Sequence, residues 1–496
     1  MDSGEMVNRR GLARNMLWLL AGNAVAQALA AVMGLLLART LGPHEYGLYA
    51  TAFSLALAFL YTALMGLDSV VPREVARHPE RAGLIALSAL VPALLWLPVL
   101  VLLILGTGLV LGYSPQVRAL LLPAALVTGV RGLVNLFRSV LRGLERMDLD
   151  AAIQAVENGL VLGGVALALL VSPTIRGAVW AILIAEALSL LPAGLGVVRM
   201  THLLMWEVRR AREMIIAALP LGLTFTLVGL NMRLDTLVLS LFRPAREVGL
   251  YNAAVSLMML ARPVALMAAA FLPPLSSLAR RDEMAFARLR DQGMLGMMVP
   301  GVGLGVAMSL LAPFLLGALY GAPFLSAAPA LRILGAGTVA VFLNAYFWQV
   351  LIARGEQKTI ACTTVVSLLL SLVLAAVLVP RWGASGAAGA VLTREMVQLA
   401  LLLRRVLGPS PLTLRRSAWA PFPVAAGAMA LILWPAREAT GSLALAHLAL
   451  AGVVYLAVLF AAAGMRIPGA ALPRGVVGSG ERGGSGAGGG ERDATA

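Results

Sequence analysis

The stretch LARTLGPHEYGLYATAFSLAL, from Leu37 to Leu57, recurs in altered form later in the chain as LVLSLFRPAREVGLYNAAVSLMML. The Gly-Leu-Tyr of residues 47–49 aligns with the Gly-Leu-Tyr of residues 249–251, an offset of 202 residues, which is the difference between 249 and 47. The match continues without a gap, and Ala52, Ser54 and Leu55 fall on Ala254, Ser256 and Leu257. This stretch indicates an internal duplication.

A second echo supports the duplication. GAVWA at residues 177–181 is followed by Glu186, and GAAGA at residues 386–390 is followed by Glu395 at the same spacing. Two echoes in the same order favour two copies of one unit, and each copy holds an even number of apolar spans. We therefore expect a parallel repeat, with two six-helix lobes related by a pseudo-twofold axis along the membrane normal.

The composition is that of a membrane protein. Hydrophobic residues make up 60% of the 496 positions, charged residues only 13%, and the mean hydropathy is +0.88. The net charge of +15 comes from basic residues in short clusters between long apolar runs, a membrane topology pattern that excludes a nucleic-acid partner. The single cysteine, Cys362, and four scattered histidines predict neither an internal disulfide nor a metal site.

The apolar runs predict an all-α polytopic membrane protein with fourteen transmembrane helices, in which two six-helix lobes surround a central cavity and two helices follow them. Most basic residues lie in the loops on the side of the N-terminus, so we expect both termini in the cytoplasm and the chain in the inner (cytoplasmic) membrane. The expected parts are an N-terminal segment (1–15), a first lobe (16–198), a linker (199–213), a second lobe (214–403), two further spans (418–463) and a disordered Gly-rich tail (464–496).

The loops between the spans are short. They leave no extramembrane domain, and the chain lacks nucleophile, base and phosphate-loop motifs, so we predict no catalytic residues and no enzymatic activity. The longest inner loop, 276–293, alternates arginine with apolar residues and predicts a helix lying at the membrane interface.

Charged residues inside the spans are the candidate functional residues, because each charge costs about 2.5 to 3.5 kcal/mol at mid-membrane. In the fourth span Arg131, Asn135, Arg138 and Arg142 recur at helical spacing and form one stripe. In the second half Arg262 and Arg394 lie near the middle of the eighth and twelfth spans, and Arg233 and Arg332 lie nearer the outer ends.

Four acidic residues lie in the same spans: Glu157, Glu186, Asp235 and Glu395. One reading is a structural network of ion pairs, and the other is that these acids couple transport to Na⁺ or H⁺. Residues one or two positions apart do not face each other on a helix, so we expect any pairs to form between spans. The intramembrane arginines outnumber these acids, and the surplus favours an anionic substrate.

Five fragments together resemble the MOP flippase superfamily, in its polysaccharide-transporter branch of Wzx-type O-antigen and oligosaccharide-lipid flippases. They are ARTLGPHEYGLY (38–49), GLDSVVPREVARH (66–78), RLDTLVLSLFRPAREVGLYNAA (233–254), FLPPLSSL (271–278) and VPRWGASGAAGA (379–390). The resemblance implies a V-shaped two-lobed bundle that moves undecaprenyl-diphosphate-linked oligosaccharide to the outer leaflet by alternating access. It implies no cofactor, and it implies contacts with membrane lipids and with enzymes of polysaccharide biosynthesis by a chain that acts as a monomer.

Other readings remain open at this point. A lipid II flippase also has fourteen spans and a cationic cavity. A MATE-type cation-coupled drug exporter is disfavoured because the first span lacks an acid and the interior charge is positive. A glycan polymerase or a glycosyltransferase is disfavoured by the absence of a large loop. Within the flippase reading, Arg131, Arg262 and Arg394 are expected to converge on one cavity and bind the diphosphate, with Asn135, Arg138 and Arg233 as further ligands.

Overall fold

The computed structural model describes residues 3–201, 206–279, 281–408, 412–413, 418–437 and 442–463, and every regular element in these ranges is a helix. The predicted disordered tail, 464–496, lies outside the described residues. Ten helices are long and apolar enough to cross a membrane. The chain is therefore a multi-pass membrane protein, whereas the count of fourteen spans stays a prediction.

Helices of the first half are α1 (Ser3–Ala58), α2 (Leu67–Arg77), α3 (Ala82–Val110), α4 (Pro115–Gly143), α5 (Met147–Val171), α6 (Ile175–Met200) and α7 (Val208–Asn231). Those of the second half are α8 (Leu234–Phe242), α9 (Ala245–Met259), α10 (Arg262–Ala265), α11 (Leu272–Leu278), α12 (Glu283–Leu310), α13 (Ala312–Tyr320), α14 (Ala328–Ala353), α15 (Gln357–Leu407), α16 (Pro421–Ala436) and α17 (Ser442–Ala463). Short 3₁₀ turns at Pro79–Arg81, Leu266–Phe271 and Ala322–Ala327 complete the order.

Two helices each contain two of the predicted spans. Helix α1 has a kink at Gly42, where φ is 77°, and α15 has one at Gly383, where φ is 54°. Positive φ is readily adopted only by glycine, so these two positions let the chain reverse without a loop. The predicted boundaries between the first and second spans and between the eleventh and twelfth spans fall at these kinks.

Other predicted spans are interrupted, which corrects the expectation of continuous helices. The second span stops at Ala58 and resumes as α2, and the eighth stops at Met259 and resumes as α10. The two breaks lie at equivalent places in the repeat. The first contains positive φ at Met65 and Gly66. The second lies shortly before Pro263, which has no N–H to donate to the Met259 carbonyl oxygen. The predicted seventh and ninth spans are broken after Asn231 and after Leu310 in the same way.

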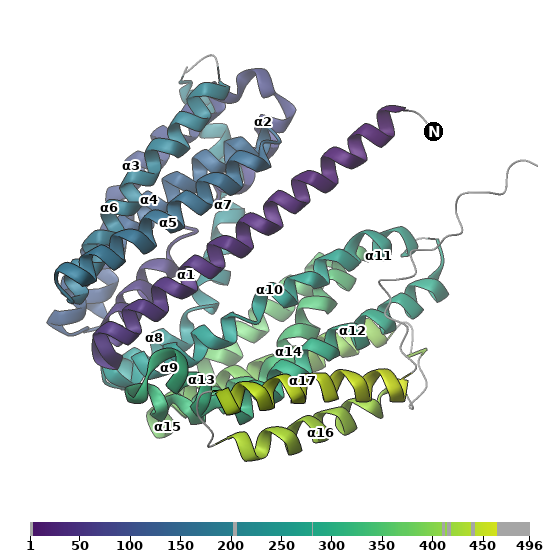
Figure 1. The fold of residues 1–496 in the computed structure, drawn as a ribbon. Coiled ribbons are helices and arrows are strands. Elements are labelled where there is room, and N and C mark those ends of the chain that lie inside the picture. Colours follow the sequence, from purple (N-terminus) through teal and green to yellow (C-terminus); the bar gives the residue numbers. More distant parts are fainter. Residues whose placement is uncertain are drawn as a thin grey trace, which may run out of the picture.

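Figure 1 shows two bundles that meet at one end and diverge toward the other. They meet around the kinked part of α1, together with α8, α9, α13 and α15, and they diverge toward the end that carries the N-terminus and α11. The largest apolar core cluster runs through the meeting end, joining residues such as Phe53 of α1 to Tyr251 of α9 and Phe324 after α13. This junction closes one end of the molecule.

Helix α7 lies in the first bundle, although the sequence placed residues 214–231 in the second lobe (Figure 1). It packs against α2 and α3. At its contact with the turn before α2, a Cβ on Gly66 would come within 2.4 Å of the Ala218 carbonyl oxygen, and one on Gly222 within 2.5 Å of the Met65 carbonyl carbon. This close backbone approach holds α7 against the first bundle. The chain therefore passes from the first bundle to the second at the α7–α8 break, and not in the predicted linker at 199–213.

The segment predicted as an interfacial helix, 276–293, is different in the structure. Helix α12 begins at Glu283, and Arg290 and Asp291 are fully buried within the second bundle. Each charge satisfies the other, because Arg290 Nη2 lies 2.7 Å from Asp291 Oδ1. The paired charges allow this part of the helix to enter the bundle instead of lying on its surface.

Candidate functional site

The arginine stripe of α4 faces acids of α5 and α6. Arg131 donates through Nε to Glu186 Oε1 at 2.8 Å and lies 3.8 Å from Glu157. Arg138 donates through Nε to Asp150 Oδ1 at 2.8 Å, and its Nη1 lies 3.8 Å from Glu157. The arginines of the stripe therefore form ion pairs with acids of their own bundle. This arrangement agrees with the first of the two alternatives above, a structural network of ion pairs.

The network continues toward the end of α4. Arg142 Nη1 donates to Asp150 Oδ1 at 3.3 Å, and Arg138 Nη1 donates to Asn135 Oδ1 at 3.2 Å. Asp150 is not among the predicted site residues because it lies just before a predicted span, which begins at residue 151. Its spacing of seven residues from Glu157 puts both acids on one face of α5, and that spacing was the available signal.

The second bundle holds a smaller charged cluster. Tyr251 of α9 donates a hydrogen bond to Asp235 of α8. Arg394 Nη2 lies 2.8 Å from Glu395 Oε1, and Asn344 of α14 donates to Glu395 Oε2 at 2.9 Å. The expectation that adjacent residues cannot pair was wrong, because the long arginine side chain bends back to its own neighbour here.

The Glu186 and Glu395 positions are equivalent in the two bundles. They are separated by 209 residues, the difference between 395 and 186, and the same offset relates Asn135 to Asn344. Each glutamate contacts the helix that corresponds to the fourth predicted span of its copy. Glu186 pairs with Arg131 of α4, and Glu395 accepts a hydrogen bond from Asn344 of α14. The duplication therefore preserves the placement of the acid and changes its partner.

Arg233 is the predicted ligand that remains without a counterion. It lies between α7 and α8, its side chain is partly exposed, and within the described part of the chain no acceptor lies at bonding distance from its guanidinium. Arg332 of α14 is exposed. Arg262 begins α10, and its side chain lies outside the described residues.

Tyr49 marks the place where the candidate residues approach one another. The charges of Arg131, Arg233 and Glu186 all act on its hydroxyl group. Its repeat equivalent, Tyr251, contacts Asp235 and is acted on by Arg394. Arg131 and Arg394 thus belong to separate clusters, each with its own acids. Their convergence on one cavity stays a prediction, and Arg131 and Arg233 are the pair that the structure brings near one side chain.

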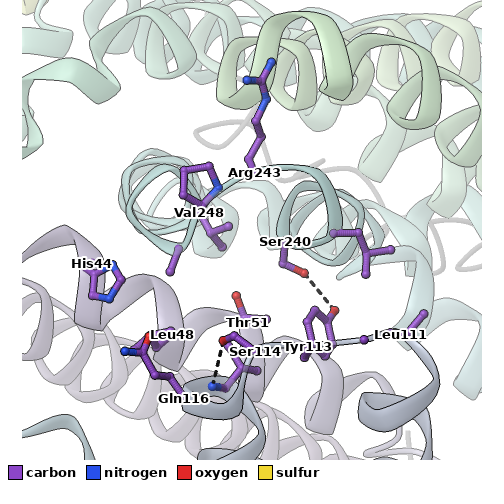
Figure 2. Close-up of a pocket in the computed structure, with 15 residues that line it drawn as sticks. His44, Leu48, Thr51, Leu111, Tyr113, Ser114, Gln116, Ser240, Arg243 and Val248 are labelled. Atoms are coloured by element: carbon purple, nitrogen blue, oxygen red, sulfur yellow. Dashed lines mark hydrogen bonds between the residues drawn. The ribbon is translucent and has the colours of Figure 1, made fainter.

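A pocket with a volume of about 290 Å³ lies at the junction of the bundles, between α1, the start of α4 and the α8–α9 turn. Figure 2 shows Tyr113 and Ser240 facing each other across it, and their hydroxyl groups are 2.9 Å apart. Arg243 points away from the pocket and donates through Nη2 to the Pro380 carbonyl oxygen of α15 at 2.7 Å. The hydrogen bond between Tyr113 and Ser240 therefore joins the two bundles at this pocket. The guanidinium of Arg243 is directed to α15 and does not line the interior of the pocket. No group of acids, histidines or cysteines in the described residues could hold a metal ion.

A comparison with protein families decides the kind of protein that carries this network. A family model described as polysaccharide biosynthesis protein matches residues 12–279, more than half of the chain. The chain belongs to this family. A comparison with curated proteins gives no match.

Solved transporters share the fold of this chain. The lipid II flippase MurJ in an inward closed conformation has a TM-score of 0.73 and 16% identity, over 90% of this chain and 98% of the flippase. An inward-facing multidrug resistance MATE family transporter of the MOP superfamily has a TM-score of 0.65 and 17% identity, over 79% and 98%. A MOP superfamily transporter from Pyrococcus furiosus has a TM-score of 0.56 and 17% identity, over 80% and 95%. The chain therefore has the fold of MOP superfamily transporters.

Proposed function

We propose that the protein is a flippase that moves polyprenyl-diphosphate-linked oligosaccharide from the inner to the outer leaflet of the cytoplasmic membrane by alternating access. The family to which the chain belongs carries the description polysaccharide biosynthesis protein, which supports a role in a glycan pathway. The fold is that of transporters and flippases, which supports transport rather than catalysis in that pathway. In this proposal both termini lie in the cytoplasm and the chain needs no cofactor.

The observation that carries the proposal is the guanidinium of Arg233, which has no acceptor at bonding distance among the described residues. Arg233 is partly exposed at the α7–α8 break, where its guanidinium is accessible to an anion from outside the bundle, and the acids of both clusters already have other partners. Arginine presents a planar fork of donors that fits phosphate oxygens. A lipid diphosphate reaching the α7–α8 break would supply the missing charge.

Further ligands follow from the positions of the two clusters. Arg131, Asn135 and Arg138 belong to the stripe of α4, and the Asn135 side-chain amide can hydrogen-bond sugar hydroxyl groups. Arg394 and Arg262 belong to the second bundle. In the proposed site Arg233 holds the diphosphate and these side chains hold the remainder of the headgroup. Glu157, Glu186, Asp235 and Glu395 are the candidates for Na⁺ or H⁺ coupling.

A lipid II flippase is the second candidate, and one observation favours it over a drug exporter. The fold match to the lipid II flippase covers 90% of this chain, whereas the match to the MATE transporter covers 79%. The two flippase substrates share a polyprenyl diphosphate and differ in the sugar that it carries. Arg233 serves either one, so the sugar has to be distinguished by transport.

Arg233→Ala tests the proposal in a flippase-null strain and in vesicles that hold either lipid-linked oligosaccharide or lipid II. Loss of a charge-assisted bond to phosphate should lower transport about 10- to 100-fold, and Arg233→Lys should retain part of it because lysine keeps the charge and loses the fork. Arg332→Ala, at an exposed arginine of α14, is the matched control and should transport normally. Normal transport by Arg233→Ala would remove the proposed diphosphate site, and transport of lipid II alone would establish the second candidate.

A further inference from the structure

Helix α12 contains a segment that is poorly suited to a continuous helix. Residues 299–305 read VPGVGLG, in which Pro300 is followed by glycine at positions 301, 303 and 305. Proline donates no N–H to the carbonyl oxygen four residues earlier, and glycine loses more backbone entropy in a helix than other residues do. Helix α12 is nevertheless continuous from Glu283 to Leu310. This segment therefore depends on contacts from neighbouring helices.

Helix α14 contacts one face of the segment. A Cβ on Gly301 would come within 3.2 Å of the Val339 Cα atom, and one on Gly305 within 2.9 Å of the Gly335 carbonyl oxygen. Residues four apart lie on the same face of a helix, so the two backbones approach closely along this face. Small residues allow such an approach between helices in a membrane, and α14 thus holds α12 from the inside of the second bundle.

Helix α17 contacts the same segment with a single tyrosine. Helices α16 and α17 lie at the edge of the second bundle, where α16 packs against α12 (Figure 1). The ring of Tyr455 lies against Gly303, because a Cβ there would come within 3.2 Å of the ring atom Cε1. The Tyr455 hydroxyl donates to the Val299 carbonyl oxygen at 2.8 Å, and the residue is only 4% exposed. One side chain therefore contacts α12 on both sides of Pro300.

Other contacts of α16 and α17 also lie on both sides of Pro300. A separate apolar cluster joins Leu295 and Leu311 to Met429 of α16 and Leu459 of α17. Closer to the start of α12, the Asp291 carboxylate accepts two hydrogen bonds from Thr413, in the connection between α15 and α16. The pair of helices is therefore attached along the length of α12 rather than at one end.

We propose that α16 and α17 form a brace that keeps α12 rigid at Pro300, with Tyr455 as the positioning residue. Helices bend sharply at proline, so without the brace this segment acts as a hinge and a movement of one part of α12 is not passed to the other. With the brace, both parts of α12 move together with the second bundle. The effect of the brace on transport rests on the proposed function, whereas the brace itself does not.

Hydrogen–deuterium exchange of the purified protein in lipid nanodiscs tests the brace directly. Tyr455→Phe removes the hydroxyl group and keeps the ring, so amide exchange in residues 296–305 should become about fivefold faster, as one lost hydrogen bond implies. Pro300→Ala restores the missing N–H, and in its presence Tyr455→Phe should change the exchange rate little.

Tyr61→Phe is the matched control. Tyr61 is an exposed tyrosine of the first bundle whose hydroxyl group makes no hydrogen bond among the described residues, so its loss should leave exchange in α12 unchanged. An equal effect of Tyr455→Phe with and without Pro300→Ala, or no effect in either case, would overturn the inference.

Transport separates this inference from the proposed function. In vesicles loaded with polyprenyl-diphosphate oligosaccharide, Tyr455→Phe should lower the rate about fivefold, and adding Pro300→Ala should restore it, while elution as a single species shows that each variant is folded. Faster exchange with unchanged transport would retain the flippase and remove the role of the brace in transport. The exchange result in a protein that transports no lipid-linked oligosaccharide would retain the brace and remove the flippase.

Discussion

Gly47 of α1 and Gly249 of α9 lie against each other where the two bundles meet, and the contact is symmetrical. A Cβ on Gly47 would come within 1.7 Å of the Ala245 carbonyl oxygen, and one on Gly249 within 2.0 Å of the Pro43 carbonyl oxygen. Ala245 follows Pro43 by the same 202 residues that separate the two glycines. The copies thus meet through equivalent surfaces, as units related by a twofold axis do.

Gly47→Val and Gly249→Val should prevent this end of the molecule from closing. Each added side chain must displace backbone, at a cost of about 1 to 3 kcal/mol. We expect transport to fall sharply in protein that still inserts. The distance between spin labels at Gln116→Cys and Arg381→Cys, in a Cys362→Ala background, should increase. Gly163→Ala, where nothing lies within 4 Å, is the control, and an unchanged label distance in both valine variants would contradict the prediction.

Arg131→Ala should destabilise the protein by about 3 to 5 kcal/mol, because it leaves Glu186 buried without its partner. The double substitution Arg131→Met with Glu186→Leu should recover much of that loss, since it removes both charges together. Thermal unfolding in detergent measures both effects. Arg146→Ala, which breaks an exposed pair with Asp148, should cost less than about 1 kcal/mol. Equal effects of the two alanine substitutions would show that the α4 pair contributes no more than a surface pair.

Asp291→Ala should loosen the connection between α15 and α16. The Asp291 carboxylate is fully buried and accepts from the Thr413 backbone nitrogen at 2.6 Å and from the Thr413 hydroxyl group at 2.7 Å. Its loss also leaves Arg290 without its carboxylate, so we expect a cost of about 3 kcal/mol and faster proteolysis near residue 413. Thr413→Val removes one of the two bonds and should cost about 1 kcal/mol. Proteolysis at the wild-type rate in Asp291→Ala would argue against this anchor.

Arg118→Cys and Arg381→Cys should be labelled from outside the cell by an impermeant thiol reagent, and Arg77→Cys and Arg209→Cys only after the membrane is opened. The arginine distribution predicts this orientation, and all four side chains are exposed, Arg77 at 70% and Arg209 at 85%. The single native cysteine, Cys362, is first replaced by alanine. Reversed labelling would place the N-terminus outside and overturn the assumed direction of transport.

The sequence predicted the membrane class and the helical fold because both depend on local quantities. Apolar run length and the spacing of residues on one helix follow from the order of amino acids alone. It also predicted that Arg131 and Arg138 share one face of α4. It missed the interruption of the eighth span after Met259, where Pro263 lacks the N–H that would continue the helix.

The sequence did not predict which acid pairs with each buried arginine. Asp150 joins Arg138, and Glu395 pairs with its own neighbour Arg394, although spacing on one helix argued against that pair. Arg290 and Asp291 were read as part of a surface helix and are fully buried. A long arginine side chain reaches in several directions, so its partner depends on which acid the neighbouring helices bring near.

By itself, the sequence determined that this chain is a duplicated, helical membrane protein with arginines inside its spans. Repeats, apolar runs and charged positions all follow directly from the order of the amino acids. Only the tertiary structure decided which of those arginines are neutralised. Arg131 and Arg394 meet carboxylates of their own bundles, whereas Arg233 lies at a helix break with no acceptor among the described residues. The physical reason is that an ion pair requires approach within about 4 Å, and that distance is set by helix packing rather than by separation along the chain.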